Sequence, residues 1–277
     1  MKRKQKLGKI IATACLTVLS TIFIIPLIWM LSTSAKLEKD VMTFPIQWIP
    51  REWRFIENFK TVWMGDIPFA LFYWNSIKLV FFMTLFTLVF SSMAGFAFAK
   101  LRFPGRSLAF AILMSFFLIP EESTLVPRYI LIKWLGLYNT HEGLILMGAF
   151  SIPLTFLMRQ FLLSINKEFL EAAKIDGAGY FRMFLQIVVP LAKPILATVA
   201  ILKFIWTWNS YQTPLIFIYN PKLYTITLGI QSFKDQYTDP YAVMMMASLS
   251  AIAPILIVFI ALQKQVIKGI SAGGVKG

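Results

Sequence analysis

Long blocks of apolar residues alternate with shorter polar segments along the chain, and each block is close to 20 residues long. An α-helix of about 20 residues spans the hydrocarbon layer of a membrane, which is roughly 30 Å thick. Apolar and polar residues do not alternate as they would in the strands of a membrane β-barrel, since Phe81–Phe90 reads FFMTLFTLVF. The pattern predicts an all-α integral membrane protein. About six transmembrane helices are expected, near residues 10–32, 76–99, 107–131, 142–164, 194–218 and 243–263.

The third of these blocks is irregular. Its apolar part, Ser107–Pro120, holds 14 residues, which is about 21 Å of helix and too short to cross the hydrocarbon layer. Two acidic residues, Glu121 and Glu122, follow directly. Because proline lacks the N–H that a helix interior needs, we expect the helix to bend or break near Pro120. The two carboxylates would then lie at the outer end of the span or in a wet cavity.

Composition also indicates a membrane protein. Of the 277 residues, 58% are hydrophobic and 14% are charged, whereas soluble domains carry about 25% charged residues. The basic N-terminus leads into an apolar run that is longer than a signal-peptide core and has no small-residue cleavage site, so we expect an uncleaved first span. One cysteine, Cys15, excludes an intrachain disulfide, and one histidine, His141, cannot form a metal site by itself.

The net charge of +14 is distributed unevenly. If the N-terminus is cytoplasmic, the inner segments 2–9, 100–106, 159–193 and 264–276 hold 16 basic and three acidic residues, so they carry +13 of the total. This is the positive-inside pattern of a multi-pass plasma or inner membrane protein with both termini in the cytoplasm, and it argues against nucleic acid as a partner. Basic residues there also suit anionic membrane lipid. Six of the eight tryptophans fall at or beyond the outer boundary, as membrane-anchoring rings do.

A polar segment at about 165–193 separates the fourth and fifth spans. It begins with NKEFLEAAKIDG, in which Asn166 is a good N-cap and Gly177 suits the left-handed position after a helix. A second helix is expected over 180–189, and Pro190 leads into the next span. A short exposed helix is unstable alone, so it requires a partner to pack on. The alternative is a connecting loop that lies on the lipid surface.

The residues of this segment resemble a family signature. The segment is similar to the EAA signature of binding-protein-dependent ABC importer permeases. The matching pattern is Glu171-Ala172-Ala173, then three residues, Gly177, nine residues, Ile187, one residue and Val189-Pro190, with Val189 where leucine is usual. The ending GISAGGVKG and the loop LRFPGRS resemble the maltose-type carbohydrate permeases. The resemblance covers nearly the whole chain.

This resemblance implies a type I (MetI-like) permease architecture. The chain would form a single permease domain over 1–277, with a first span at about 10–32, a five-helix core at about 72–265 and a cytoplasmic coupling segment at about 165–193. The residues expected to couple to an ATPase are Glu171, Ala172, Ala173, Asp176, Gly177 and Pro190. The implied partners are a homologous second permease, two cytoplasmic ABC ATPase subunits and an extracellular solute-binding protein.

The ATPase must be a separate chain, because this sequence contains no G-x-x-x-x-G-K-[ST] phosphate-binding loop. ATP and Mg²⁺ would be bound by the partner ATPase subunits. No cofactor and no catalytic residue are expected in this chain, which would be a permease subunit and not an enzyme.

Several polar and aromatic residues lie within or beside the spans. Lysine in a span is costly and usually faces a cavity or an acid, while tryptophan and amides suit stacking on sugar rings and hydrogen bonding to hydroxyls. The candidate residues for a carbohydrate path are Lys203, Trp206, Trp208, Asn209, Gln212, Glu121 and Glu122. The alternative is that these groups join helices to one another. Lys203 would form a salt bridge with a carboxylate of a partner permease, or it would attract anions. If the third span bends inward, Glu121 or Glu122 would be its partner.

The resulting hypothesis is the permease subunit of an ATP-driven importer of a sugar, oligosaccharide or related polyol. An alternative is an ion-coupled secondary transporter, which usually carries acidic residues deep in its spans together with internal repeats. The five unbroken predicted spans have no Asp or Glu in their interior, and no repeat is visible. A membrane enzyme would need a metal or acid–base cluster that one His and one Cys do not supply. The sequence does not specify which solute is carried.

Overall fold

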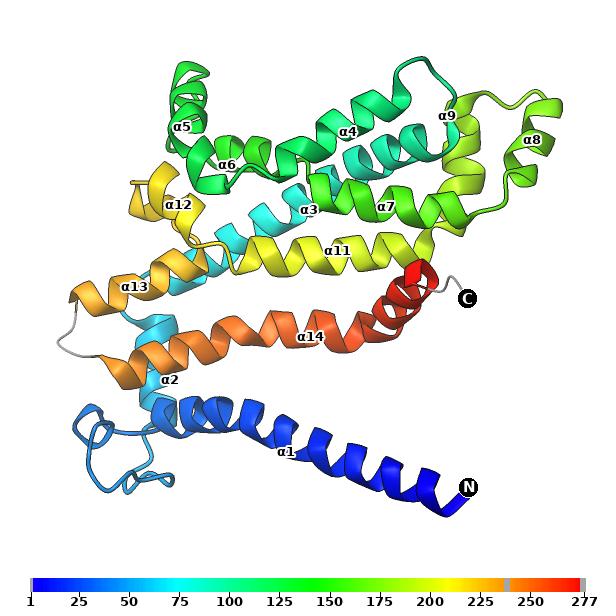
Figure 1. The fold of residues 1–277 in the computed structure, drawn as a ribbon. Coiled ribbons are helices and arrows are strands. Elements are labelled where there is room, and N and C mark those ends of the chain that lie inside the picture. Colours follow the sequence, from blue (N-terminus) through cyan, green and yellow to red (C-terminus); the bar gives the residue numbers. More distant parts are fainter. Residues whose placement is uncertain (1, 237–239, 275–277) are drawn as a thin grey trace. The chain divides into compact units, whose positions relative to one another are not determined.

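The computed structural model describes residues 2–236 and 240–274, and this part of the chain contains helices and no strand. The last three residues of the GISAGGVKG ending lie outside it. The α-helices are α1 (Lys2–Ser34), α2 (Phe55–Met64), α3 (Phe69–Lys100), α4 (Arg106–Phe117), α5 (Leu125–Trp134), α6 (His141–Gly148), α7 (Ile152–Ser164), α8 (Glu168–Ile175), α9 (Tyr180–Met183), α10 (Val189–Leu191), α11 (Lys193–Trp208), α12 (Gln212–Phe217), α13 (Ile226–Gln236) and α14 (Tyr241–Gly274) (Figure 1). Short 3-10 turns cover Glu38–Asp40 (η1), Glu121–Thr124 (η2) and Pro221–Leu223 (η4), and a π-helical turn, η3, covers Phe184–Val188.

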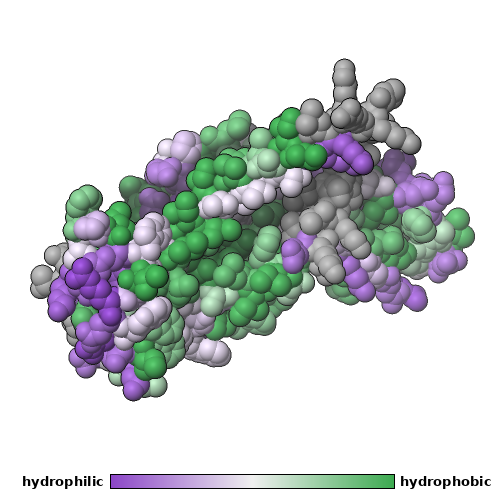
Figure 2. Space-filling model, turned by 90° about the horizontal axis from the view of Figure 1, so that it is seen from below, coloured by the Kyte–Doolittle hydropathy of each residue, from purple (hydrophilic) through white to green (hydrophobic). Residues whose placement is uncertain are grey.

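Four segments of the described chain are long and apolar enough to cross a membrane, namely Gly8–Ser34, Phe69–Lys100, His141–Ser164 and Tyr241–Gln263. Two bent helix pairs, α4 with α5 and the α9–α10 run with α11, raise the number to six if each pair is one span. On the face shown in Figure 2, hydrophobic side chains cover the middle of the helices and hydrophilic ones gather toward the ends. The prediction of an all-α membrane protein with about six spans is confirmed.

The third predicted span is broken. α4 ends at Phe117, η2 follows Pro120, and α5 leaves at 98° to α4. The break near Pro120 agrees with the sequence, and the second half of the segment predicted over 107–131 turns away from the first half. The missing N–H of Pro120 explains why the helix does not continue.

The fifth predicted span is also shorter than 194–218. α11 ends at Trp208, and α12 begins after a break of three residues. In a continuous helix Pro214 would leave the carbonyl of Ser210 without a donor and would clash with it. The chain instead restarts so that Pro214 falls in the first turn of α12, where no N–H is needed.

The described residues form two compact units. Of the described residues, the first unit holds 2–70, 229–236 and 240–253, and the second holds 71–228 and 254–274. In the first unit, the amide of Asn58 donates to the carbonyls of Ser34 and Lys36, which fixes α2 against the end of α1. The Glu38 carboxylate accepts the backbone N–H of Tyr241 and so caps α14. The assignment of one permease domain over 1–277 stays a prediction.

The second unit has a core in which α3, α7 and α11 pack together. Buried residues of this core include Phe96, Leu154, Met158, Ile195 and Val199. The α3 and α7 backbones approach closely at Gly95, where an added Cβ would lie 2.8 Å from the Cβ of Met158. Small residues permit such close helix contacts in membranes. In Figure 1, α8 and α9 lie at one end of this unit and α5 and α12 lie at the other.

Candidate functional site

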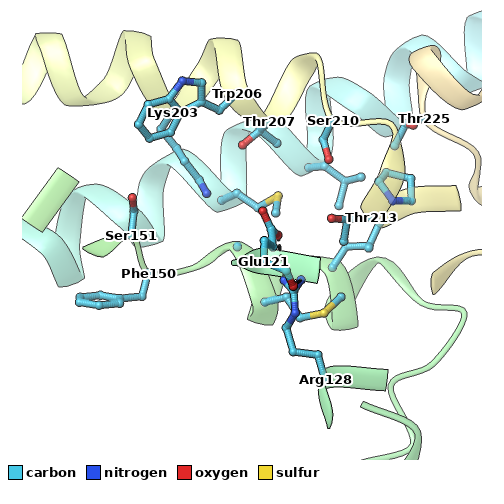
Figure 3. Close-up of a pocket in the computed structure, with 16 residues that line it drawn as sticks. Glu121, Arg128, Phe150, Ser151, Lys203, Trp206, Thr207, Ser210, Thr213 and Thr225 are labelled. Carbon is cyan, nitrogen blue, oxygen red and sulfur yellow. Dashed lines mark hydrogen bonds and ion pairs between the residues drawn. The ribbon is translucent and has the colours of Figure 1, made fainter. Parts of the chain in front are cut away.

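A polar cavity of about 280 Å³ lies in the second unit, beside α11 and the broken third span. Its lining consists of Leu79, Met83, Glu121, Arg128, Leu144, Met147, Gly148, Phe150, Ser151, Lys203, Trp206, Thr207, Ser210, Thr213, Pro214 and Thr225. Figure 3 shows hydroxyl and charged side chains from both sides of this space turned toward one another.

Local interactions fix the walls of this cavity. A buried cluster joins Leu79 of α3, Ile132 of α5, Leu144 of α6 and Phe217 of α12 behind it. The side chain of Asn139 accepts hydrogen bonds from the backbone N–H groups of Tyr219 and Asn220 at 3.1 and 3.0 Å. These bonds hold the α5–α6 turn against the segment after α12. The α3, α6 and α12 walls of the cavity therefore share one buried cluster.

Glu121 in η2 is held by a residue that sequence reasoning missed. Arg128 of α5 donates from Nη1 to Glu121 Oε1 at 2.9 Å and from Nη2 to the Glu121 carbonyl oxygen at 3.2 Å. The spacing of seven residues across η2 gives no simple helical signal, because the pair depends on how η2 leads into α5. The arginine places a carboxylate at the edge of the cavity in a fixed orientation.

Lys203 of α11 is buried, with 8% of its surface exposed, and Figure 3 shows its ammonium group pointing into the cavity toward Glu121. Among the described residues, no carboxylate lies within 4 Å of this ammonium. Together with Arg128 and Glu121, Lys203 gives the cavity one net positive charge. The inward bend of the third span thus brings Glu121 to the same cavity as Lys203.

The neutral lining suits a polyhydroxylated molecule. Side-chain hydroxyls can both donate and accept hydrogen bonds, and those that line the cavity belong to Ser151, Thr207, Ser210, Thr213 and Thr225. Trp206 adds an aromatic surface that is 47% exposed. An amphipathic ring beside convergent hydroxyls is suited to sugar-like ligands with apolar C–H faces and polar edges.

Other candidate path residues lie elsewhere. Trp208 is 2% exposed and stacks on Phe204 with an interplanar angle of 7°, so it packs in the core of the unit. The amide of Asn209 donates to the Ile205 carbonyl at the end of α11. Gln212 and Glu122 line an adjoining pocket of about 180 Å³, which also includes Glu121 and Arg128. Their roles in a path stay predictions.

The α8 helix is defined at both ends by local hydrogen bonds. The side chain of Asn166 accepts the backbone N–H of Glu168 at 3.2 Å. At the other end Gly177 adopts φ +78°, the Gly177 N–H donates to the Lys174 carbonyl, and the Ala178 N–H donates to the Ala173 carbonyl. This pair of bonds is the Schellman motif. The glycine stop predicted from the sequence is therefore present, and the Asn166 side chain bonds to the first turn although the N-cap position itself is Lys167.

The side chains of α8 are largely exposed. Phe169 is 55% exposed and Ile175 is 87% exposed, and Glu171, Ala172 and Asp176 are also at the surface. An exposed helix of eight residues gains little stability from itself. The Asn166 cap and the Gly177 stop instead hold this helix in shape while its apolar side chains stay uncovered.

The segment after α8 leads back into the spans through a distorted helix. The run from Tyr180 to Leu191 contains the π-helical turn η3 just before Pro190. Pro190 cannot donate to the carbonyl of Gln186, and a π turn is a common way to accommodate such a defect. The run meets α11 at 81°. Pro190 therefore lies before the bend and does not itself begin the span.

These elements define a multi-pass membrane transport protein with a polar cavity among its spans and a rigid exposed helix between two of them. The chain belongs to the family of binding-protein-dependent transport system inner membrane components, whose pattern matches residues 2–272.

Similar proteins extend over nearly the whole chain. It is 30% identical over 270 residues to the arabinooligosaccharides transport system permease protein AraQ of Bacillus subtilis. The aligned region covers 97% of this chain and 96% of that protein. It is 34% identical over 271 residues to the melibiose/raffinose/stachyose import permease protein MelC of Bacillus subtilis, with 96% of each covered. A chain in the crystal structure of a bacterial ABC transporter involved in alginate import has the same fold, with a TM-score of 0.83, 23% identity and coverage of 95% of this chain and 97% of that chain.

Proposed function

We propose that this chain is the permease subunit of an ATP-driven importer that carries a carbohydrate or related polyol into the cell. Two relatives are named as permeases for arabinooligosaccharides and for melibiose, raffinose and stachyose. The hydroxyl-lined cavity beside Trp206, with its charged groups, is chemically suited to such a solute. The volume of about 280 Å³ accommodates part of an oligosaccharide, and a second permease would supply the other wall.

The observation that carries the proposal is α8, an exposed helix fixed at both ends and placed between two membrane-spanning segments. Its uncovered apolar residues, Phe169 and Ile175, need a partner. The partner that the family resemblance supplies is a cytoplasmic ATPase subunit. Closure of two such subunits on ATP and Mg²⁺ would displace α8 as a rigid body and move the spans on either side of it.

The proposed orientation follows from the charge distribution, and the remaining partners follow from the family resemblance. The excess of basic residues in the inner segments supports a cytoplasmic location for α8 and both termini. A solute-binding protein would deliver the carbohydrate at the α5–α12 end of the second unit, close to the cavity. This chain would contain no ATPase residues, and nucleotide and Mg²⁺ would be bound by the partner subunits.

Cysteine accessibility tests the orientation and the docking together. In a Cys15→Ser background, Ile175→Cys is expected to crosslink to the ATPase subunit and to resist a membrane-impermeant thiol reagent added outside the cell. Tyr219→Cys is the control, because this residue is 67% exposed and follows α12 at the opposite end. It should react from outside and should not crosslink to the ATPase. External labelling of Ile175→Cys would exclude the proposed role.

The solute is tested separately with the solute-binding protein and a panel of mono-, di- and oligosaccharides and polyols. The proposal expects the sugar that the binding protein retains to be accumulated by cells that hold the complete transporter, and to be lost when the ATPase subunit is deleted. Accumulation that continues without the ATPase and depends on an ion gradient would favour a secondary transporter.

A further inference from the structure

A second, larger cavity of about 520 Å³ lies near the α8 end of the second unit. It is lined by Phe96, Ala99, Lys100, Leu101, Arg102, Arg106, Leu163, Lys167, Leu170, Glu171, Lys174, Tyr180 and Met183. The lining thus combines five cationic side chains and one carboxylate with a set of apolar residues. The carbohydrate-import proposal gives this cavity no role.

The charge of this cavity is not neutralised within the described part of the chain. None of its five cationic side chains forms an ion pair within 4 Å there, and Glu171 is the one acidic residue of the lining. Lys100 Nζ donates to the Ile165 carbonyl at 2.5 Å, and Arg106 Nη1 donates to the Leu101 carbonyl at 2.9 Å. These bonds to neutral acceptors position two of the cations without cancelling their charge.

The cavity also lies at the ends of three helices. Lys100 is the last residue of α3 and Arg106 is the first of α4, while Leu163 is next to the last residue of α7. Two membrane helices, α3 and α7, therefore end around it and a third, α4, begins there. In the proposed orientation this is where the cytoplasmic lipid phosphates would lie. Leu163, which is 44% exposed, gives the cavity an apolar wall beside the cations, and the buried residues Phe96 and Ala99 close its inner side.

We propose that this cavity binds the phosphate-bearing headgroup of an anionic phospholipid, with its acyl chains along the apolar wall. Basic pockets between membrane helices on the cytoplasmic side bind such headgroups, and each basic residue near the surface contributes about fivefold to affinity. A diffuse positive-inside charge would be spread over the whole surface. Here the cations from the α3–α4 connection and from both ends of α8 line one half-open cavity.

The site also connects lipid with the α8 helix. Glu171 and Lys174 belong to α8, and both line the cavity. A bound phosphate attracts Lys174 and repels Glu171, so the membrane's anionic lipid content would bias the position of α8.

The complete transporter, purified with its partner subunits in phosphatidylcholine micelles, tests this site. Phosphatidylglycerol is titrated in and the bound lipid is counted by native mass spectrometry, with and without excess inorganic phosphate. The double variant Arg102→Gln with Lys167→Gln is expected to lower phosphatidylglycerol affinity by about fivefold to 25-fold. The charge-keeping variant Arg102→Lys with Lys167→Arg should stay within about twofold of the unchanged protein.

The matched control removes two cations from outside the cavity. Arg182 and Lys193 are exposed residues of the same segment, and Arg182→Gln with Lys193→Gln should leave lipid binding unchanged. An equal loss in this control would show that general surface charge binds the lipid and would overturn the site. Full displacement by inorganic phosphate would assign the cavity to a soluble phosphate group. The proposal would also be refuted if the transporter retained phosphatidylcholine as well as it retains phosphatidylglycerol. The same holds if no lipid were retained and Lys167 crosslinked to the ATPase subunit.

Discussion

Arg128 binds Glu121 through two of its nitrogens, one to the carboxylate and one to the backbone carbonyl, just after the break in the third span. The pair connects η2 to α5 and forms one edge of the polar cavity. The Glu121 side chain is 70% exposed, so the ion pair itself stabilises the fold by no more than about 1 kcal/mol. The pair acts mainly by fixing the positions of the Glu121 carboxylate and the Arg128 guanidinium at the edge of the cavity.

Arg128→Gln is therefore expected to lower solute uptake several-fold while it changes the apparent unfolding temperature in detergent by no more than a few degrees. The matched control is Lys133→Gln on the same helix, because Lys133 is exposed and lines neither of the two cavities near Glu121. Uptake assays and thermal unfolding of both variants make the comparison. Equal uptake by the two variants would remove Arg128 from the path.

Two tryptophans of α11 should behave differently. Trp206 lines the cavity, so Trp206→Ala should reduce uptake with little loss of folded protein. Trp208 is buried and makes an edge contact with Tyr73 as well as stacking on Phe204. Trp208→Ala should therefore cost about 3–5 kcal/mol of stability, seen as lower membrane abundance and a lower unfolding temperature. The reverse pattern, with stable but inactive Trp208→Ala protein, would place Trp208 on the path.

The difference between these residues shows where sequence reasoning ends. Positions two apart on a helix point to different sides, but only the rotation of α11 against α3 decides which side faces the cavity. The pairing of Arg128 with Glu121 likewise depends on the turn after Pro120. The α8 ends were predictable because Asn166 and Gly177 act on their own neighbouring backbone. The six apolar blocks were predictable for a similar reason, since each helix satisfies its own hydrogen bonds in lipid.

Gly177 offers a sharper test of α8. Its φ of +78° disfavours residues with a Cβ by about 1–2 kcal/mol, and least so asparagine. Gly177→Val should unwind the end of α8, abolish most uptake and weaken ATPase copurification, while membrane abundance stays unchanged. Gly177→Asn should retain most activity. A steric clash does not explain the expected effect of Gly177→Val, since no atom lies within 4 Å of a Cβ added at this position.

Gly136 is a matched control for this effect. It ends α5 with φ +72° and with the same pair of hydrogen bonds, and it is equally open. Gly136→Val should impose the same strain at the other end of the unit, so ATPase copurification should persist. If Gly136→Val releases the ATPase as fully as Gly177→Val does, the loss reflects general instability and not docking.

Lys36, just after α1, makes the first unit sensitive to alkaline pH. Its side chain is 1% exposed, its ammonium lies 4.1 Å from the centre of the Trp29 ring, and Nζ has no hydrogen-bond partner in the described structure. Burial lowers the pKa of Lys36 from its usual 10.5, and the charge of Asp40 opposes this only in part. The folded protein therefore binds fewer protons at this site than the unfolded chain does.

It follows that stability should rise with pH between the lowered pKa of Lys36 and about 10.5, where the unfolded lysine loses its proton. Lys36→Met keeps the buried stem and removes the titration, so this contribution to the pH dependence should disappear. Lys39→Met, at an exposed position three residues on, should keep it. Apparent unfolding temperatures of the three proteins in detergent from pH 7 to about 10.5 decide the matter. An identical slope for Lys36→Met and the unchanged protein would show that the Lys36 ammonium keeps its proton in the folded state throughout this range.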